Sequence, residues 1–186
     1  MEGYIGRVLP SIWINMIIFN NMTNKEKIIN EAKRIEEDSL YSAKGHFCTG
    51  RRWTCLHLWL GGISVALSAI AGASALSQFD YHNIVAGIIS IIVAGLTAVI
   101  TFINPNDRAS IHKKSGNMYS SLKNDARIFY DIEVNELDDK KSIEDLKRLN
   151  DRRNKLNLES QIIPGWAFKK ARKGIEEGEA KYKVDN

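Results

Sequence analysis

The feature that most constrains this chain is a long central segment that is almost free of charge. Residues 56–106 contain one formal charge, Asp80, although 26 Lys and Arg and 22 Asp and Glu are distributed over the 186 residues. Two apolar runs fill this segment, Leu56–Ser77 and Ile84–Ile103, and neither contains a charged side chain. An α-helix of about 20 residues crosses the roughly 30 Å hydrocarbon core of a bilayer. The sequence therefore predicts a transmembrane hairpin over residues 56–103.

The alternative is a helical hairpin buried in the core of a soluble protein. Such helices usually keep charged side chains on one face, and these two runs have none on any face. The mean hydropathy of the whole chain, −0.25, resembles that of a soluble domain only because the charged flanks offset the apolar centre. The net charge of +4 is small and interspersed, so direct nucleic-acid binding is not predicted.

The distribution of basic residues predicts the orientation of the hairpin. The connection Gln78–Asn83 contains no Lys or Arg, whereas basic residues lie just outside the two apolar runs: Lys44, Arg51, Arg52, Arg108, Lys113 and Lys114. By the positive-inside rule, both termini are cytoplasmic and the short loop is outside. Aromatic residues at the two ends suit interfacial belts, with Trp53 and Trp59 at one end and Phe79 and Tyr81 at the other.

The charged flanks predict cytoplasmic helices. Thr23 and Glu26 have the spacing of a capping box, and residues 23–55 form an amphipathic helix that leads towards the first span. After the interruption at 104–106, residues 104–186 contain three further helical patterns. The third of these patterns runs from Gly165 to about Lys181. No segment alternates with a period of two residues. We therefore expect an all-α fold, in which a two-helix transmembrane hairpin is flanked by long cytoplasmic helices that form a bundle.

The N-terminal segment 1–22 does not fit this plan. Its apolar part, Ile12–Phe19, is too short to span a bilayer, and it lacks the small-residue cleavage site of a secretory signal. We interpret it as upstream sequence before a natural start at Met22, the alternative being an interfacial segment.

Two residue patterns within the spans predict different roles. Polar side chains recur on one face of each span and are candidates to line a pore between several hairpins: His57, Ser64, Ser68, Ser90, Thr97 and Thr101. Small residues recur at four-residue spacing in rows that include Ser64, Ser68 and Ser90, and their other members are candidates for close helix packing in a homo-oligomer: Gly72, Ala86, Ala94 and Ala98. The alternatives remain open. Hydroxyls often bond to carbonyls of their own helix, and small residues can serve packing within one hairpin.

No pattern predicts catalysis or a cofactor. Glycine-rich phosphate loops and paired-histidine metal motifs are absent from the sequence. A zinc site from Cys48, Cys55 and His46 would need a fourth ligand that the sequence does not offer, so reduced, packed thiols are expected instead. Asp138 and Asp139 are expected in a solvated turn. The chain is predicted not to be an enzyme and to hold no metal.

Three phrases in this layout resemble a known family. EAKRIEEDSLYSAKGHFCTGRRW (Glu31–Trp53), FINPNDRASIHKKSGNMYSSLKNDARIFY (Phe102–Tyr130) and IPGWAFKKARKGIEEGEAKY (Ile163–Tyr182), with the two spans between the first and second, are similar to SLATT-domain proteins. The resemblance covers about residues 22–185.

The resemblance implies a membrane effector of bacterial anti-phage defence. Such proteins are encoded beside nucleotide second-messenger synthases, nucleotide sensors or reverse transcriptases, and are thought to assemble in the inner membrane and disrupt it. By position, Leu56–Ile103 would be the pore-forming part, and the flanking helices would receive a signal from a partner sensor or a nucleotide. The competing interpretation is a membrane-anchored scaffold whose hairpin is only a tether.

Overall fold

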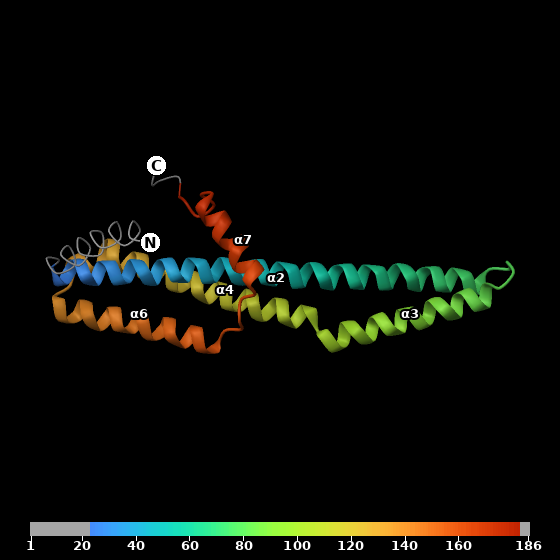
Figure 1. Ribbon diagram of the computed structural model, residues 1–186. Helices are drawn as coiled ribbons and strands as arrows, with labels where there is room; N and C mark the ends of the chain where they lie inside the picture. The colour runs from blue at the N-terminus through green and yellow to red at the C-terminus, as the bar shows by residue number, and fades with distance from the viewer. Residues whose placement is uncertain (1–22, 183–186) are drawn as a thin grey trace, which may run out of the picture. The chain divides into compact units, whose positions relative to one another are not determined.

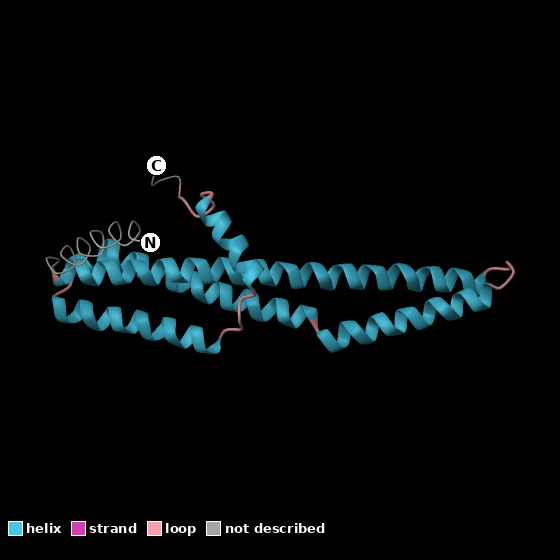
Figure 2. Ribbon diagram, viewed as in Figure 1, coloured by secondary structure: helices cyan, strands magenta, loops and turns pink. Residues whose placement is uncertain are grey.

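The computed structural model describes residues 23–182, and every regular element in that range is a helix (Figures 1 and 2). This confirms the predicted all-α fold. The N-terminal segment 1–22, and with it the proposed start at Met22, lies outside the described residues. The elements are α2 (Asn24–Leu76), α3 (His82–Ile103), α4 (Pro105–Ile128), the π-helical segment η1 (Phe129–Glu133), the short α5 (Val134–Glu136), α6 (Asp139–Glu159) and α7 (Gly165–Glu176).

The helices form two compact units, and both α2 and α4 pass from one unit to the other. Of the described residues, one unit contains 23–40 and 119–158, and the other contains 41–118 and 159–182. The sequence predicted an amphipathic helix followed by a separate span, but α2 is one uninterrupted helix. Its middle contains neither a proline nor a capping residue in the left-handed region, so nothing in the backbone ends it.

The predicted capping box begins α2. The backbone N–H of Thr23 donates to the Glu26 carboxylate at 2.7 Å, and the Glu26 N–H donates to the Thr23 hydroxyl at 3.3 Å. These two bonds satisfy donors that the first helical turn leaves unpaired.

The first unit has a small apolar core between the start of α2, the end of α4 and α6. Its fully buried side chains are Ala32, Ile35, Leu122, Ala126, Phe129 and Val134. Bonds between helices surround the core: the Tyr130 hydroxyl donates to Glu36 at 2.7 Å, and Arg153 pairs with Asp38 at 3.2 Å. α6 begins at Asp139. Asp138 accepts the Lys141 N–H at 2.7 Å and is therefore the N-cap of α6.

In the second unit, α2 and α4 approach closely at two glycines. A Cβ added to Gly50 would lie 3.2 Å from the Ala109 carbonyl, and one added to Gly116 would lie 2.8 Å from the Phe47 ring. The side chains of His46 and His112, 1% and 4% exposed, meet between these glycines. The neighbouring Phe47 is 38% exposed.

Two residues in the left-handed region delimit α3. Tyr81 (φ 64°) closes the short loop before α3, and Asn104 (φ 46°) ends the helix by donating its N–H to the Ile100 carbonyl at 2.9 Å. Pro105 follows as the first residue of α4, where its missing N–H costs no hydrogen bond. Figure 1 shows α3 returning from the loop antiparallel to the C-terminal part of α2.

The last helix, α7, packs its small residues inward. Ala167, Ala171 and Gly174 are buried, whereas Trp166 and Phe168 are 39% and 43% exposed. The helix ends at Glu176 and does not reach Lys181 as predicted. Gly178 (φ 91°) donates its N–H to the Ile175 carbonyl, and Glu179 donates its N–H to the Gly174 carbonyl. This is the pattern of a Schellman cap.

Candidate functional site

Two helices of the described chain are long and apolar enough to cross a membrane by length and composition. They are α2, through its C-terminal part, and α3. No residue of α3 is buried, and its outward face consists of large apolar side chains, including Ile84 (59% exposed), Ile88 (56%) and Ile91 (74%). The core helix of a soluble protein would have most of this surface covered.

The less exposed residues of the two helices recur at spacings of three and four, which identifies the inner faces of the hairpin. On α2 they include His57, Leu60, Ser64, Leu67, Ala71 and Ser74, and on α3 they include His82, Ala86, Ile89, Val93, Leu96 and Ile100. This spacing is typical of two helices that cross at a small angle. Of the predicted pore-lining residues, His57 and Ser64 therefore lie on the inner face.

The remaining predicted pore-lining residues are exposed and do not converge within one chain. They are Ser68, Ser90, Thr97 and Thr101. The five hydroxyls among the predicted pore-lining residues each donate to the carbonyl four residues earlier in the same helix, at 2.8–2.9 Å. This is the local bonding expected of Ser and Thr in apolar helices, and it satisfies these groups without a partner chain. His57 differs, because its buried Nδ1 has no hydrogen-bond partner among the described residues.

The predicted packing residues divide between the two faces. Ala86 is half-buried on the inner face, while Gly72, Ala94 and Ala98 are exposed on the outside of the hairpin. A Cβ built on Gly72 would meet no described atom within 4 Å. These three positions are therefore not used for packing within one hairpin.

Cations and tryptophans gather where the apolar parts of α2 and α3 meet the polar part of the second unit. The Arg108 guanidinium lies 5.3 Å from the centre of the Trp53 ring, and its Nε donates to the Ile103 carbonyl at the end of α3 at 2.9 Å. Arg52 lies over the ring of Trp166 on α7 at 4.6 Å. Sequence reasoning identified the basic residues but not their aromatic partners, because Arg52 and Trp166 are far apart in the chain.

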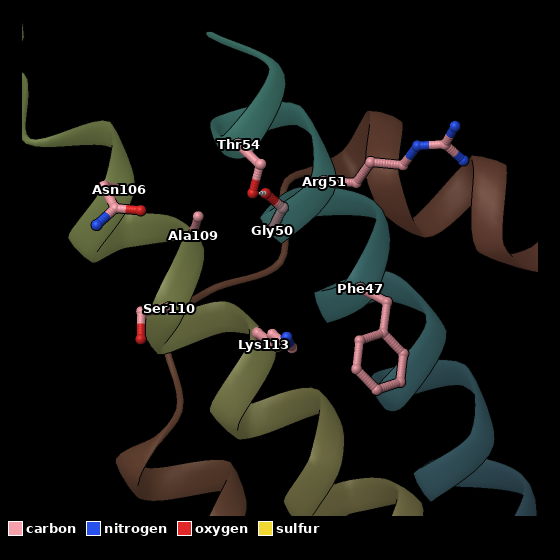
Figure 3. Close-up of a pocket in the computed structure, with 8 residues that line it drawn as sticks. All are labelled: Phe47, Gly50, Arg51, Thr54, Asn106, Ala109, Ser110 and Lys113. Carbon is pink, nitrogen blue, oxygen red and sulfur yellow. Dashed lines mark hydrogen bonds between the residues drawn. The ribbon is translucent and has the colours of Figure 1, made fainter. Parts of the chain in front are cut away.

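A groove lies just beyond the apolar segments, between Phe47–Thr54 of α2 and Asn106–Lys113 of α4 (Figure 3). Its volume is about 440 Å³. Figure 3 shows the Arg51 side chain extending away from α4, so its guanidinium does not face Lys113 across the groove. The two cations therefore do not face each other in a way that would let them bind an anionic ligand from both sides.

The buried pair of histidines, His46 and His112, was not predicted. The Nδ1 atoms of His46 and His112 lie 2.9 Å apart, so one ring donates its Nδ1–H to the other. Burial, and secondarily the neighbouring His112 ring, lowers the pKa of His46 from 6.5 to about 4, while burial lowers the pKa of His112. Both rings are therefore neutral at pH 7. The signal in the sequence was the three- and four-residue spacing of Ser39, Ala43 and His46.

The described residues contain no group of three or more His, Cys, Asp or Glu side chains that could hold a metal ion. Cys48 is half-buried and Cys55 is exposed, and neither forms a disulfide. Asp138, one of the two acidic residues expected in a solvated turn, caps α6.

Searches against family models, curated proteins and solved structures find no match to this chain.

Proposed function

We propose that this chain is a non-enzymatic effector of the bacterial inner membrane, similar to SLATT-domain proteins, and that it acts in anti-phage defence. Its hairpin assembles with other copies and opens or disrupts the membrane when a nucleotide or a partner protein signals infection. The observation that supports membrane insertion most strongly is the outer surface of α3, where large apolar side chains are exposed and no residue is buried. In water such a surface would be costly, at about 25 cal/mol per Å² of apolar area.

Charge and aromatic residues support one orientation of the hairpin. Arg51, Arg52 and Arg108 flank the end that carries the termini, and the loop at the other end contains no Lys or Arg. Exposed aromatic residues accompany both ends, with Trp59 (72% exposed) at one and Tyr81 (75%) at the other. Both termini are then cytoplasmic.

Assembly is supported by the small residues that one hairpin leaves unused. Helices associate in lipid through close backbone approach, which small side chains permit. Gly72, Ala94 and Ala98 are exposed, and Leu at these positions would not clash with the inner face of the same hairpin.

The test combines localisation with leakage. The protein should float with membranes after carbonate washing, and induction in growing cells should collapse the membrane potential. Ala94→Leu and Ala98→Leu should reduce both oligomer formation and depolarisation. Val99→Leu, a control that enlarges a neighbouring exposed residue outside the small-residue row, should reduce neither. Equal effects of Ala98→Leu and Val99→Leu would refute the packing argument.

The second candidate is a membrane-anchored scaffold whose hairpin is a tether. The observation that favours it is the hydroxyl bonding, since Ser90 and Thr97 are already satisfied by carbonyls of α3. A tether leaves the membrane sealed, so dye-filled vesicles containing the purified protein would not leak. Where leakage occurs, the conductance of Ser90→Val and Thr97→Val decides whether these residues line the path.

A further inference from the structure

A second cavity, distinct from the groove of Figure 3, lies where the apolar part of α2 begins. Its volume is about 560 Å³, and most of its lining is apolar or aromatic. The lining residues are Thr49, Arg52, Trp53, Cys55, Leu56, Trp59, Pro164 and Trp166. The cavity therefore lies between two segments that are far apart in the sequence. One is residues 49–59 of α2, and the other is the start of α7, with Pro164 and Trp166.

One end of the cavity is apolar. Leu56 and Trp59 are three residues apart at the start of the uncharged segment, and Trp59 is 72% exposed. A small cavity with three tryptophans in its wall suits a flat or chain-like apolar ligand.

The other end of the cavity contains an unpaired cation. Arg52 stacks on the Trp166 ring at 4.6 Å, and within residues 23–182 it forms no ion pair with a carboxylate. A guanidinium that stacks on an indole keeps the N–H groups at its edge available, and these match the geometry of a phosphate. None of the lining residues is acidic.

The depth of Arg52 fits this ligand if α2 crosses a bilayer. Arg52 precedes Leu56 by four residues, which corresponds to about 6 Å along a helix that rises 1.5 Å per residue. The headgroup layer on each side of the hydrocarbon core is about 5–8 Å thick. Arg52 then lies at phosphate level, and Trp59 lies at the edge of the hydrocarbon.

We propose that this cavity binds one anionic phospholipid. The phosphate contacts the guanidinium of Arg52, the upper part of an acyl chain lies against Leu56 and Trp59, and Trp166 closes the site. A soluble phosphate would leave the tryptophans uncovered. A zwitterionic lipid such as phosphatidylcholine offers Arg52 the same phosphate, but its choline cation finds no acidic residue in the lining. The proposal rests on the proposed membrane hairpin but does not depend on pore formation. Because Trp166 is on α7, the bound lipid stabilises the contact between α7 and α2.

The exposed thiol of Cys55 reports occupancy of the cavity. In a Cys48→Ser background, alkylation of Cys55 by a water-soluble maleimide is measured in neutral detergent micelles during titration with phosphatidylglycerol, phosphatidylcholine or inorganic phosphate. Phosphatidylglycerol should slow alkylation about tenfold at saturation, and the other two should have little effect. Arg52→Gln should raise the half-protecting concentration of phosphatidylglycerol at least about tenfold, because the phosphate loses a hydrogen bond to a charged group.

Two control variants are matched to the site. Arg51→Gln removes the adjacent cation, which lines the other groove, and Phe168→Ala removes an exposed ring of α7 that contacts Tyr41 at 6.2 Å and does not line the cavity. Both should retain protection, whereas Trp166→Ala should lose it. Equal protection by phosphatidylcholine and phosphatidylglycerol, protection by inorganic phosphate alone, or equal effects of Arg51→Gln and Arg52→Gln would each overturn the proposal. Protein that fails to float with membranes would instead refute the proposed function.

Discussion

The buried histidine pair makes the stability of the second unit depend on pH. The pKa of His46 is lowered from 6.5 to about 4, so between these values the unfolded chain binds more protons than the folded one. The stabilisation that results from a neutral His46 is complete above pH 6.5 and is lost as the pH falls towards 4. From these two pKa values, the free energy of unfolding should decrease by about 2 kcal/mol between pH 7.5 and pH 5. The lowered pKa of His112 acts in the same direction.

The matched variant for this prediction is His46→Gln. Glutamine offers the Nδ1 of His112 a hydrogen-bond donor but does not titrate, while the surface carboxylates titrate equally in both proteins. Urea unfolding in neutral detergent micelles, followed by circular dichroism, gives the difference in unfolding free energy between the two proteins at each pH. Between pH 7.5 and pH 5, the parent should lose about 2 kcal/mol of unfolding free energy relative to His46→Gln. A constant difference, or an NMR titration of His46 with a midpoint near 6.5, would refute the reasoning.

Three further predictions concern packing and capping. Gly116→Ala should destabilise the protein by about 1–3 kcal/mol because the new methyl group meets the Phe47 ring at 2.8 Å. The control is Gly62→Ala, in open space within a helix, which should be neutral or stabilising by up to about 1 kcal/mol. Urea unfolding compares the stabilities of the two variants. Asp138→Ala should cost about 1 kcal/mol and increase hydrogen exchange in the first turn of α6, and unchanged exchange there would contradict its role as N-cap. Tyr130→Phe should cost about 1–2 kcal/mol by removing the bond to Glu36. Burial is the first cause of the raised pKa of Tyr130, so this residue should be less ionised at pH 10 than an ordinary tyrosine, as the difference in absorbance between the parent and Tyr130→Phe shows.

The sequence predicted the helices well because their signals are local. Thr23 and Glu26 form the capping box that their spacing indicated, and the break after Ile103 occurs at Asn104 and Pro105. Errors arose where the end of a helix depends on one residue. The predicted last helix continued to about Lys181, but Gly178 adopts a left-handed conformation that ends it at Glu176.

Contacts between distant segments were beyond this kind of reasoning. Periodicity indicates that residues 23–55 form an amphipathic helix, but it does not show that His46 is fully buried while the neighbouring Phe47 is 38% exposed. The partner of His46, on α4, follows only from the packing of the two helices at Gly50 and Gly116. In the same way, the predicted polar and small residues of α2 and α3 divide between the inner and outer faces of the hairpin, because the inner face depends on the register between the two helices.

The joint between α3 and α4 has a mechanical consequence. Pro105 has no N–H to donate to α3, so the chain can change direction there while the backbone hydrogen bonds within both helices stay intact, although the bond from Arg108 Nε to the Ile103 carbonyl crosses the joint. Between Tyr41 and Leu76, by contrast, α2 has no such joint, and a bend must stretch or break hydrogen bonds at about 1 kcal/mol each. Within the hairpin, α2 is therefore stiff, whereas α3 is joined to α4 by a hinge. A displacement of α4 would tilt α3 before it bent α2.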